Sequence, residues 1–191
     1  MLFWNPSITR VALLPNAIQP DSFAVERARV AHDGSLLVDG APARGNVLLS
    51  TPPGGVGLQD GTVIHSTSES LFVSAPGGVR LRYVIGGTYP DGWLAGGGSI
   101  TVWPADGRLD GRLVLSLGAP RDGKTLKMWF DQAHARTVFA RIAAGRSVEI
   151  AIPLCSRHPV TIEYRAEPTK FIPEGMVSGT LDAARFVPGG C

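Results

Sequence analysis

The side chains that most often perform catalysis or bind metals are few in this chain, and their spacing fits no established pattern. None of the four histidines belongs to an H-E-x-x-H motif, and Cys155 to His158 is a single Cys-x-x-His without a second half. Asp131 and His134 stand three positions apart and His65 to Ser70 is rich in hydroxyls, but no G-x-S-x-G turn accompanies them. We therefore expect no metal site and no catalytic residues. A small hydrolase or lyase using Asp131, His134 or His65 is kept as a third alternative.

The two cysteines, Cys155 and Cys191, can pair with each other. Such a disulfide would be worth roughly 4 kcal/mol in the chain-entropy model and would tie down the C-terminal tail. Pairing would indicate an oxidising compartment, whereas free thiols would suit a cytosolic protein. The first ten residues do not form an intact secretory signal. The disulfide therefore favours an excised, extracytoplasmic domain of a larger protein, with residues 1–10 as a flexible or cloning-derived arm.

Short segments of alternating polarity, separated by turn residues, indicate the elements that must position any site. Asp-Gly pairs are frequent between them and are strong hairpin signals. Phe23 to Ala31 and Gln132 to Ala144 are compatible with helix, although Thr137 to Phe139 favour a loop followed by a strand in the second. The clearest alternating runs are Val79 to Ile85, Arg112 to Leu117, Lys124 to Phe130, Ser147 to Ile152 and Pro159 to Arg165. The pattern predicts an all-β, two-sheet antiparallel β-sandwich of the jelly-roll kind, with about ten to twelve strands in one domain over 1–191.

Composition narrows the classes of partner. Gly 24 and Pro 15 in 191 residues imply many turns, and no apolar stretch is long enough for a membrane span. The net charge is only +2, and the basic residues are spread among acids, so we expect no nucleic-acid partner. A soluble domain is expected, with any membrane contact made by a parent segment outside these residues.

The aromatic residues are the most informative candidates for a ligand surface. Trp103 and Trp129 fall out of phase with the apolar faces of their strands, and the loop from Gly86 to Gly98 adds Tyr89, Asp91 and Trp93. Flat rings on a sheet face can hold the C–H face of a sugar while nearby polar groups bind its hydroxyls. The alternative is that each tryptophan packs beneath a covering strand or loop.

The stretch from Pro90 to Pro120 resembles the C-terminal extracytoplasmic β-sandwich regions of actinobacterial-type polytopic membrane glycosyltransferases. VEIAIP at 148–153, PVTIEY at 159–164 and SGTLDAARF at 178–186 extend the resemblance over roughly residues 79 to 187. It implies a jelly-roll fold, an extracytoplasmic location and contact with a glycan, with catalysis in a membrane portion elsewhere.

These observations favour a non-catalytic domain that binds or positions a cell-envelope glycan. The ligand-binding candidates are Tyr89, Asp91, Trp93, Trp103 and Trp129. The second alternative is a structural or protein-protein interaction module that uses the same aromatic residues. We expect no cofactor. A structural calcium ion is compatible with Asp91, Asp106 and Asp182, but their spacing shows no ligand pattern and none is claimed.

Overall fold

A computed structural model describes residues 10–13, 25–50, 54–67, 70–89, 91–122, 124–133, 137–172 and 175–190. These residues form eighteen strands in antiparallel sheets and no helix, which confirms the predicted all-β class. It follows that they contain no helix able to cross a membrane. The number of strands exceeds the ten to twelve expected, because the residues before Val56 build much of a third sheet. The predicted N-terminal arm lies outside the described residues except for Arg10.

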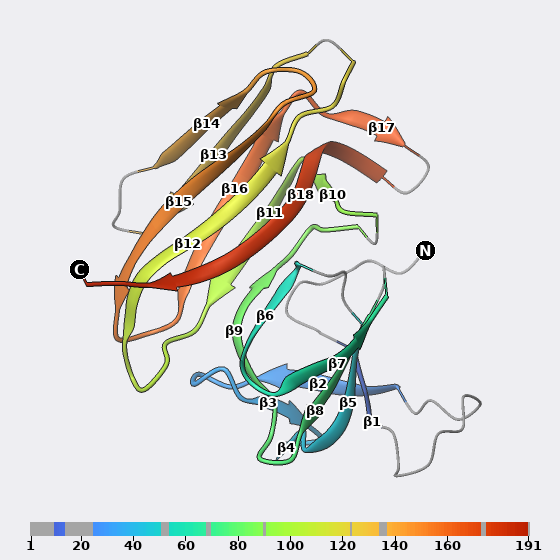
Figure 1. Ribbon diagram of the computed structural model, residues 1–191, viewed down its shortest axis with the longest axis vertical. Helices are drawn as coiled ribbons and strands as arrows, with labels where there is room; N and C mark the ends of the chain where they lie inside the picture. Colours follow the sequence, from blue (N-terminus) through green and yellow to red (C-terminus); the bar gives the residue numbers. More distant parts are fainter. Residues whose placement is uncertain are drawn as a thin grey trace.

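Two sheets face each other in the upper part of Figure 1. The β12 sheet has the order β10 (Trp93–Ala95), β18 (Gly175–Pro188), β12 (Leu109–Gly118), β15 (Ser147–Ser156), with β17 (Lys170–Ile172) beside β18. The β16 sheet has the order β14 (Val138–Ile142), β13 (Leu126–Gln132), β16 (Val160–Glu167), β11 (Gly97–Val102), β9 (Arg80–Ile85), β6 (Val56–Asp60). One cluster of buried side chains joins the two sheets.

The chain crosses between these sheets at almost every step. From β10 to β16 each strand lies in the sheet opposite its predecessor, apart from the β13–β14 hairpin, and the chain then returns to the β12 sheet for β17 and β18. The first strand of this series, β10, pairs with the last, β18. This order, together with the shared core, is consistent with the jelly-roll sandwich that the sequence predicts.

The core follows the period-two pattern of the sequence, because alternate side chains of a strand point to opposite faces. The inward residues of one strand from each sheet are at most 1% exposed; they are Leu113, Leu115 and Leu117 of β12 and Leu126, Met128 and Phe130 of β13. The residues between them, Val114 and Ser116 of β12 and Lys127 and Trp129 of β13, therefore point away from this core.

A third sheet lies below the sandwich in Figure 1. Its order is β4 (Ala41–Pro42), β3 (Leu36–Val38), β2 (Val25–Val30), β1 (Arg10–Leu13), β5 (Gly45–Ser50), β8 (Leu71–Ala75), β7 (Thr62–Ser66). Both segments that were compatible with helix contain strands instead: β2 lies within Phe23 to Ala31, and β14 lies within Gln132 to Ala144. Valine, isoleucine and phenylalanine in these strands favour extended backbone.

Strand β9 joins the third sheet to the sandwich. Tyr83 and Ile85 belong to the sandwich core, whereas Leu81 and Val84 belong to a second buried cluster beneath it. The turn before β3 approaches β9 closely at Gly34, where an added Cβ would lie 2.5 Å from the Leu81 carbonyl oxygen. The two clusters therefore share one strand, and the assignment of the chain to a single domain stays a prediction.

Candidate functional site

A row of aromatic and basic side chains crosses the outer face of the β16 sheet. Because Met128 and Phe130 point into the core, Trp129 points outward from β13. Phe139 of β14 and Arg165 of β16 lie opposite Trp129 in the strand register, one on each side. The Trp129 and Phe139 ring centroids are 5.3 Å apart, and Arg165 Cζ lies 4.8 Å from the Trp129 centroid. We call Phe139, Trp129 and Arg165 the Trp129 row.

The Trp129 row is accessible to a ligand. Phe139 is 51% exposed, Arg165 is exposed and Trp129 is half-buried. Across β16, the residue opposite Arg165 is Gly97 of β11, which has no side chain to cover the row. Adjacent aromatic rings that share an open sheet face form a contiguous apolar patch, and such a patch can bind another molecule.

Polar groups lie beside the Trp129 row on the same face. Asp131, two positions along β13, stands opposite Glu163 of β16, which in turn stands opposite Ser99 of β11. Thr137 Oγ1 donates a hydrogen bond to Asp131 Oδ1. Outward residues two positions apart on one strand are about 7 Å apart, so a ligand the size of a sugar ring on Trp129 could reach these oxygens.

The other predicted cluster forms a tight turn before β10. Tyr89 N–H donates to the Trp93 carbonyl at 2.8 Å, and Trp93 N–H donates to Asp91 Oδ1 at 3.3 Å. Leu94 is in the core, so Trp93 lies on the outer side of the β12 sheet and is half-buried. Asp91 therefore holds the turn, and the assignment of Tyr89, Asp91 and Trp93 as ligand contacts stays a prediction.

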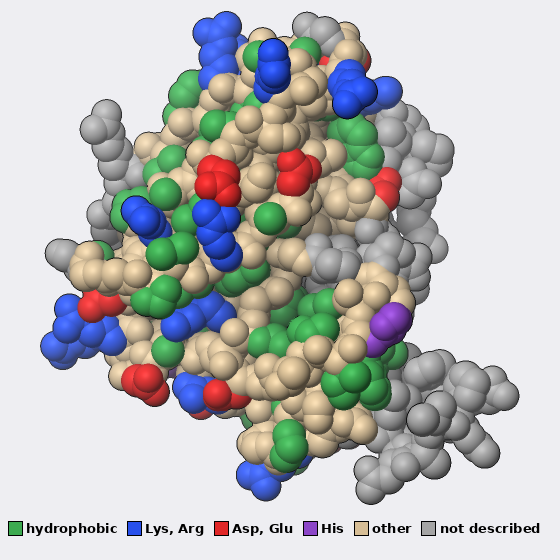
Figure 2. Space-filling model, in the orientation of Figure 1, with side chains coloured by type: hydrophobic (Ala, Val, Ile, Leu, Met, Phe, Trp, Pro, Cys, Tyr) green, Lys and Arg blue, Asp and Glu red, His purple; other side chains and the backbone are tan. Residues whose placement is uncertain are grey.

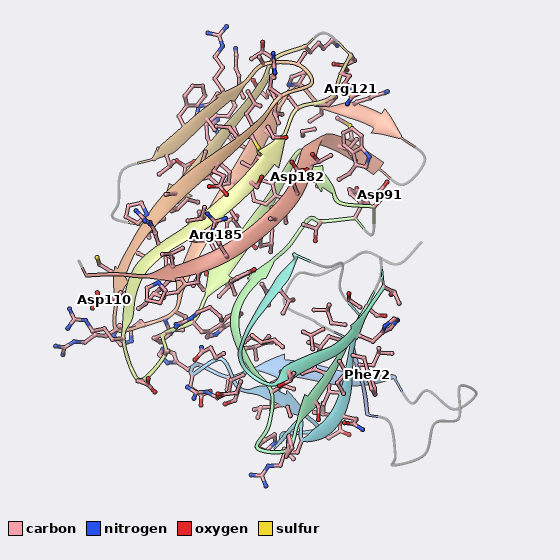
Figure 3. The ribbon with its side chains drawn as sticks, in the orientation of Figure 1. Phe72, Asp91, Asp110, Arg121, Asp182 and Arg185 are labelled. Atoms are coloured by element: carbon pink, nitrogen blue, oxygen red, sulfur yellow. The ribbon has the colours of Figure 1, made fainter. Side chains whose placement is uncertain are left out.

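These two groups do not form one surface. Trp129 lies on the outer face of the β16 sheet, whereas Trp93 lies on the outer side of the opposite sheet. Figure 3 shows Asp91 in the turn near β18, and Figure 1 shows β13 and β14 on the other side of the sandwich. The ligand-binding candidates are therefore spread over at least two surfaces of the sandwich.

Trp103, the remaining candidate, is buried rather than exposed to a ligand. Trp103 is 7% exposed and belongs to the buried cluster with Val84 and Leu81. Its N–H donates to the Arg82 carbonyl at 2.9 Å, just past the end of β11. The side chain points away from the sandwich core, as the alternation predicts, but the third sheet covers that part of the face. Trp103 is a packing residue.

Cys155 lies on β15, and Cys191 lies outside the described residues, so their disulfide stays a prediction. The described backbone brings the tail close to Cys155. Asp110 of β12 stands opposite Cys155, and the Asp110 carbonyl accepts the Gly189 N–H at 3.3 Å. Only one residue, Gly190, then separates Gly189 from Cys191 in the sequence, which suits the predicted pairing.

The residues considered for catalysis are not brought together. His65 is on β7 in the third sheet, Asp131 is on β13, and His134 lies outside the described residues. No group of three or more His, Cys, Asp or Glu side chains in the described part of the chain could hold a metal ion, and this includes Asp91, Asp106 and Asp182. His32 and His158 do meet, with ring centroids 5.6 Å apart, but both are exposed and no third His, Cys, Asp or Glu among the described residues joins them.

Sequence reasoning missed Phe139 and Arg165. Each is an ordinary outward residue of its own strand, and only the register across β14, β13 and β16 aligns them with Trp129. The one available signal was the apolar side chain of Phe139. From its own segment alone, however, an outward phenylalanine cannot be distinguished from a core residue.

Comparison with known proteins adds no relative. No protein-family model matches the chain, and neither a curated protein nor a solved structure is significantly similar to it.

Proposed function

We propose that the protein is a non-catalytic, extracytoplasmic β-sandwich domain that binds or positions a cell-envelope glycan through the Trp129 row. The observation that supports this best is the alignment of Phe139, Trp129 and Arg165 on one open sheet face. In this proposal the domain is an accessory part of a membrane glycosyltransferase, as the sequence resemblance implies.

The chemistry of the row suits a sugar. The aromatic rings of Trp129 and Phe139 offer apolar contact to the C–H face of a pyranose or furanose. The Arg165 guanidinium, held beside Trp129, has donors for sugar oxygens, and the carboxylates of Asp131 and Glu163 accept from sugar hydroxyls. Because the face is open, contact is limited to one side of the ligand and weak affinity is expected.

Binding of the folded chain to arabinans, galactans and mannans by calorimetry or on a glycan array tests the proposal. Replacing Trp129 by alanine should weaken binding about tenfold, because an aromatic contact contributes roughly 1 kcal/mol or more. Phe139→Ala should weaken it less, since Phe139 is at the end of the row. Trp93→Ala changes the same residue type on the opposite sheet and serves as the matched comparison.

The outcomes separate the alternatives. Loss of binding in Trp93→Ala with full binding in Trp129→Ala would move the site to the turn before β10. Absence of binding to any glycan by a folded wild-type protein would refute the proposal and favour the interaction module.

A second candidate function, protein-protein interaction, is favoured by strand β7. This strand is the edge of the third sheet, and all five of its residues are exposed. Val63 and Ile64 are 45% and 55% exposed, so this edge presents two large apolar side chains next to each other. Edge strands with free backbone groups are common places for a partner strand to add.

A further inference from the structure

A cavity of about 390 Å³ opens at the end of the sandwich where β12 turns into β13. It lies between that turn, the residues before β17 and the start of β18. Its lining combines charged, hydroxyl and apolar groups, among them Asp122, Lys124, Leu126, Thr169, Lys170 and Ser178. The volume is within the range of pockets that bind small molecules.

Ser178 has the feature that most clearly indicates a ligand. Its side chain is 3% exposed, lines the cavity, and its Oγ has no hydrogen-bond partner among the described residues. A buried hydroxyl without a partner is costly, so such groups are rare unless something else binds them. Strand β18 bulges at this point, because Leu94 pairs with Gly179 and Ala95 pairs with Val177, leaving Ser178 outside the ladder. Bulges of this kind re-aim side chains next to functional sites.

The charge of the lining favours an anion. The whole chain has three lysines, and two of them, Lys124 and Lys170, line this one cavity. The lining has one carboxylate, Asp122, which accepts the backbone N–H of Lys124 at 3.2 Å, so the two ammonium groups outnumber it. Arg121 lies at the same end of the molecule (Figure 3), where Figure 2 shows several basic side chains at the surface.

We propose that this cavity binds a hydroxylated organic anion about the size of a monosaccharide. Its carboxylate or phosphate group contacts Lys124 and Lys170, and one of its hydroxyl oxygens accepts a hydrogen bond from Ser178 Oγ. Leu126 and the two prolines of the lining, Pro120 and Pro168, contact the carbon skeleton. The site shares no residue with the Trp129 row, so it does not depend on the proposed glycan function.

Titration of the full chain with four probes tests this proposal. Glucuronate and glucose 1-phosphate carry both an anionic group and hydroxyls, inorganic phosphate has only the charge, and glucose has only the hydroxyls. We expect both hydroxylated anions to bind, with an affinity that falls as salt increases, and phosphate and glucose to bind at least about tenfold more weakly. Tighter binding of glucuronate would indicate a uronate of a glycan as the source, and tighter binding of glucose 1-phosphate a phosphorylated sugar.

Three substitutions locate the binding. Lys170→Gln should weaken it about tenfold, because a charge-assisted contact is lost. Ser178→Ala should also weaken it but should raise the melting temperature of the unliganded protein, since it removes the buried hydroxyl without a partner. Lys127→Gln is the matched control: it changes the one remaining lysine, which is exposed on the outer face of β13, and should leave binding unchanged.

The proposal is overturned if neither hydroxylated anion binds at about 10 mM, a concentration that detects even weak sites. It is also overturned if phosphate or glucose binds as tightly as they do, or if Lys127→Gln weakens binding as much as Lys170→Gln. If Trp129→Ala still binds the anions, the cavity and the Trp129 row are independent sites. Failure of the glycan proposal would then not refute the anion proposal.

Discussion

Replacing Tyr83 by phenylalanine should destabilise the protein at neutral pH and stabilise it, relative to wild type, in strong alkali. The Tyr83 ring is 5% exposed in the sandwich core, and its hydroxyl donates to the Ala184 carbonyl of β18 at 2.6 Å. This bond links β9 of one sheet to β18 of the other. Loss of the hydroxyl leaves the Ala184 carbonyl without this donor and should cost about 1 kcal/mol at pH 7.

The alkaline effect has the opposite sign. Burial raises the pKa of Tyr83 from its ordinary value near 10 to about 12. The neutral phenol is therefore favoured in the folded state, and the stability associated with it is complete below pH 10 and is lost as the pH rises towards 12. The wild-type protein should lose about 1 kcal/mol through this group by pH 11 and about 2 kcal/mol by pH 11.5, and the variant should lose neither. The two stability curves should therefore cross near pH 11.

Urea unfolding followed by tryptophan fluorescence, at several pH values from 7 to 11.5, measures both effects. Burial also raises the pKa of Tyr164, whose hydroxyl donates to the Gly86 carbonyl at 3.0 Å, but that residue is the same in both proteins and cancels in the difference. Tyr89→Phe controls for removal of a phenol outside the core, from a half-buried turn residue, and should change the free energy of unfolding at pH 7 by less than about 0.5 kcal/mol. Parallel curves for wild type and Tyr83→Phe up to pH 11.5 would refute the reasoning.

Two further predictions concern the predicted disulfide and the edge strand. If the disulfide is present, the wild-type protein should show no reactive thiol when denatured, and its reduction should lower the free energy of unfolding by roughly 3 to 4 kcal/mol. The free energy of unfolding of Cys155→Ser should not change with reductant. A wild-type protein whose stability is unaffected by reductant would exclude the pairing. Ile64→Lys should abolish any concentration-dependent association seen by sedimentation while leaving the fold intact, because a charge on an exposed edge opposes strand addition. Association that survives this substitution would place the interface elsewhere.

The core residues of the sandwich could be predicted from the sequence because the alternation within each strand decides which of its side chains are buried. Leu113, Leu115 and Leu117 alternate with polar or smaller residues, and a strand with that pattern has only one face it can bury. The turns could be predicted equally well from Asp-Gly pairs. Asp39 and Gly40 both adopt positive φ, as do Asp106 and Gly107, which is the backbone that Asp-Gly pairs accommodate.

The candidate site was less predictable because it depends on contacts between distant segments. Trp103 and Trp129 have the same sequence signature, yet one is covered by the third sheet and the other is open. No local pattern distinguishes them. Ser178 could not be predicted for a similar reason. Its buried hydroxyl lacks a hydrogen-bond partner among the described residues because of a bulge in the pairing of β10 with β18, and the sequence gives no sign of that bulge.

The pairing of β10 with β18 also constrains how the protein can be made. Strand β10 is complete at Ala95, but its neighbour in the sheet begins only at Gly175. During synthesis, the apolar inner face of the sandwich therefore stays incomplete until β18 has left the ribosome. Such distant pairings fold slowly and expose apolar surface meanwhile, so the nascent chain should depend on chaperones during the interval between β10 and β18.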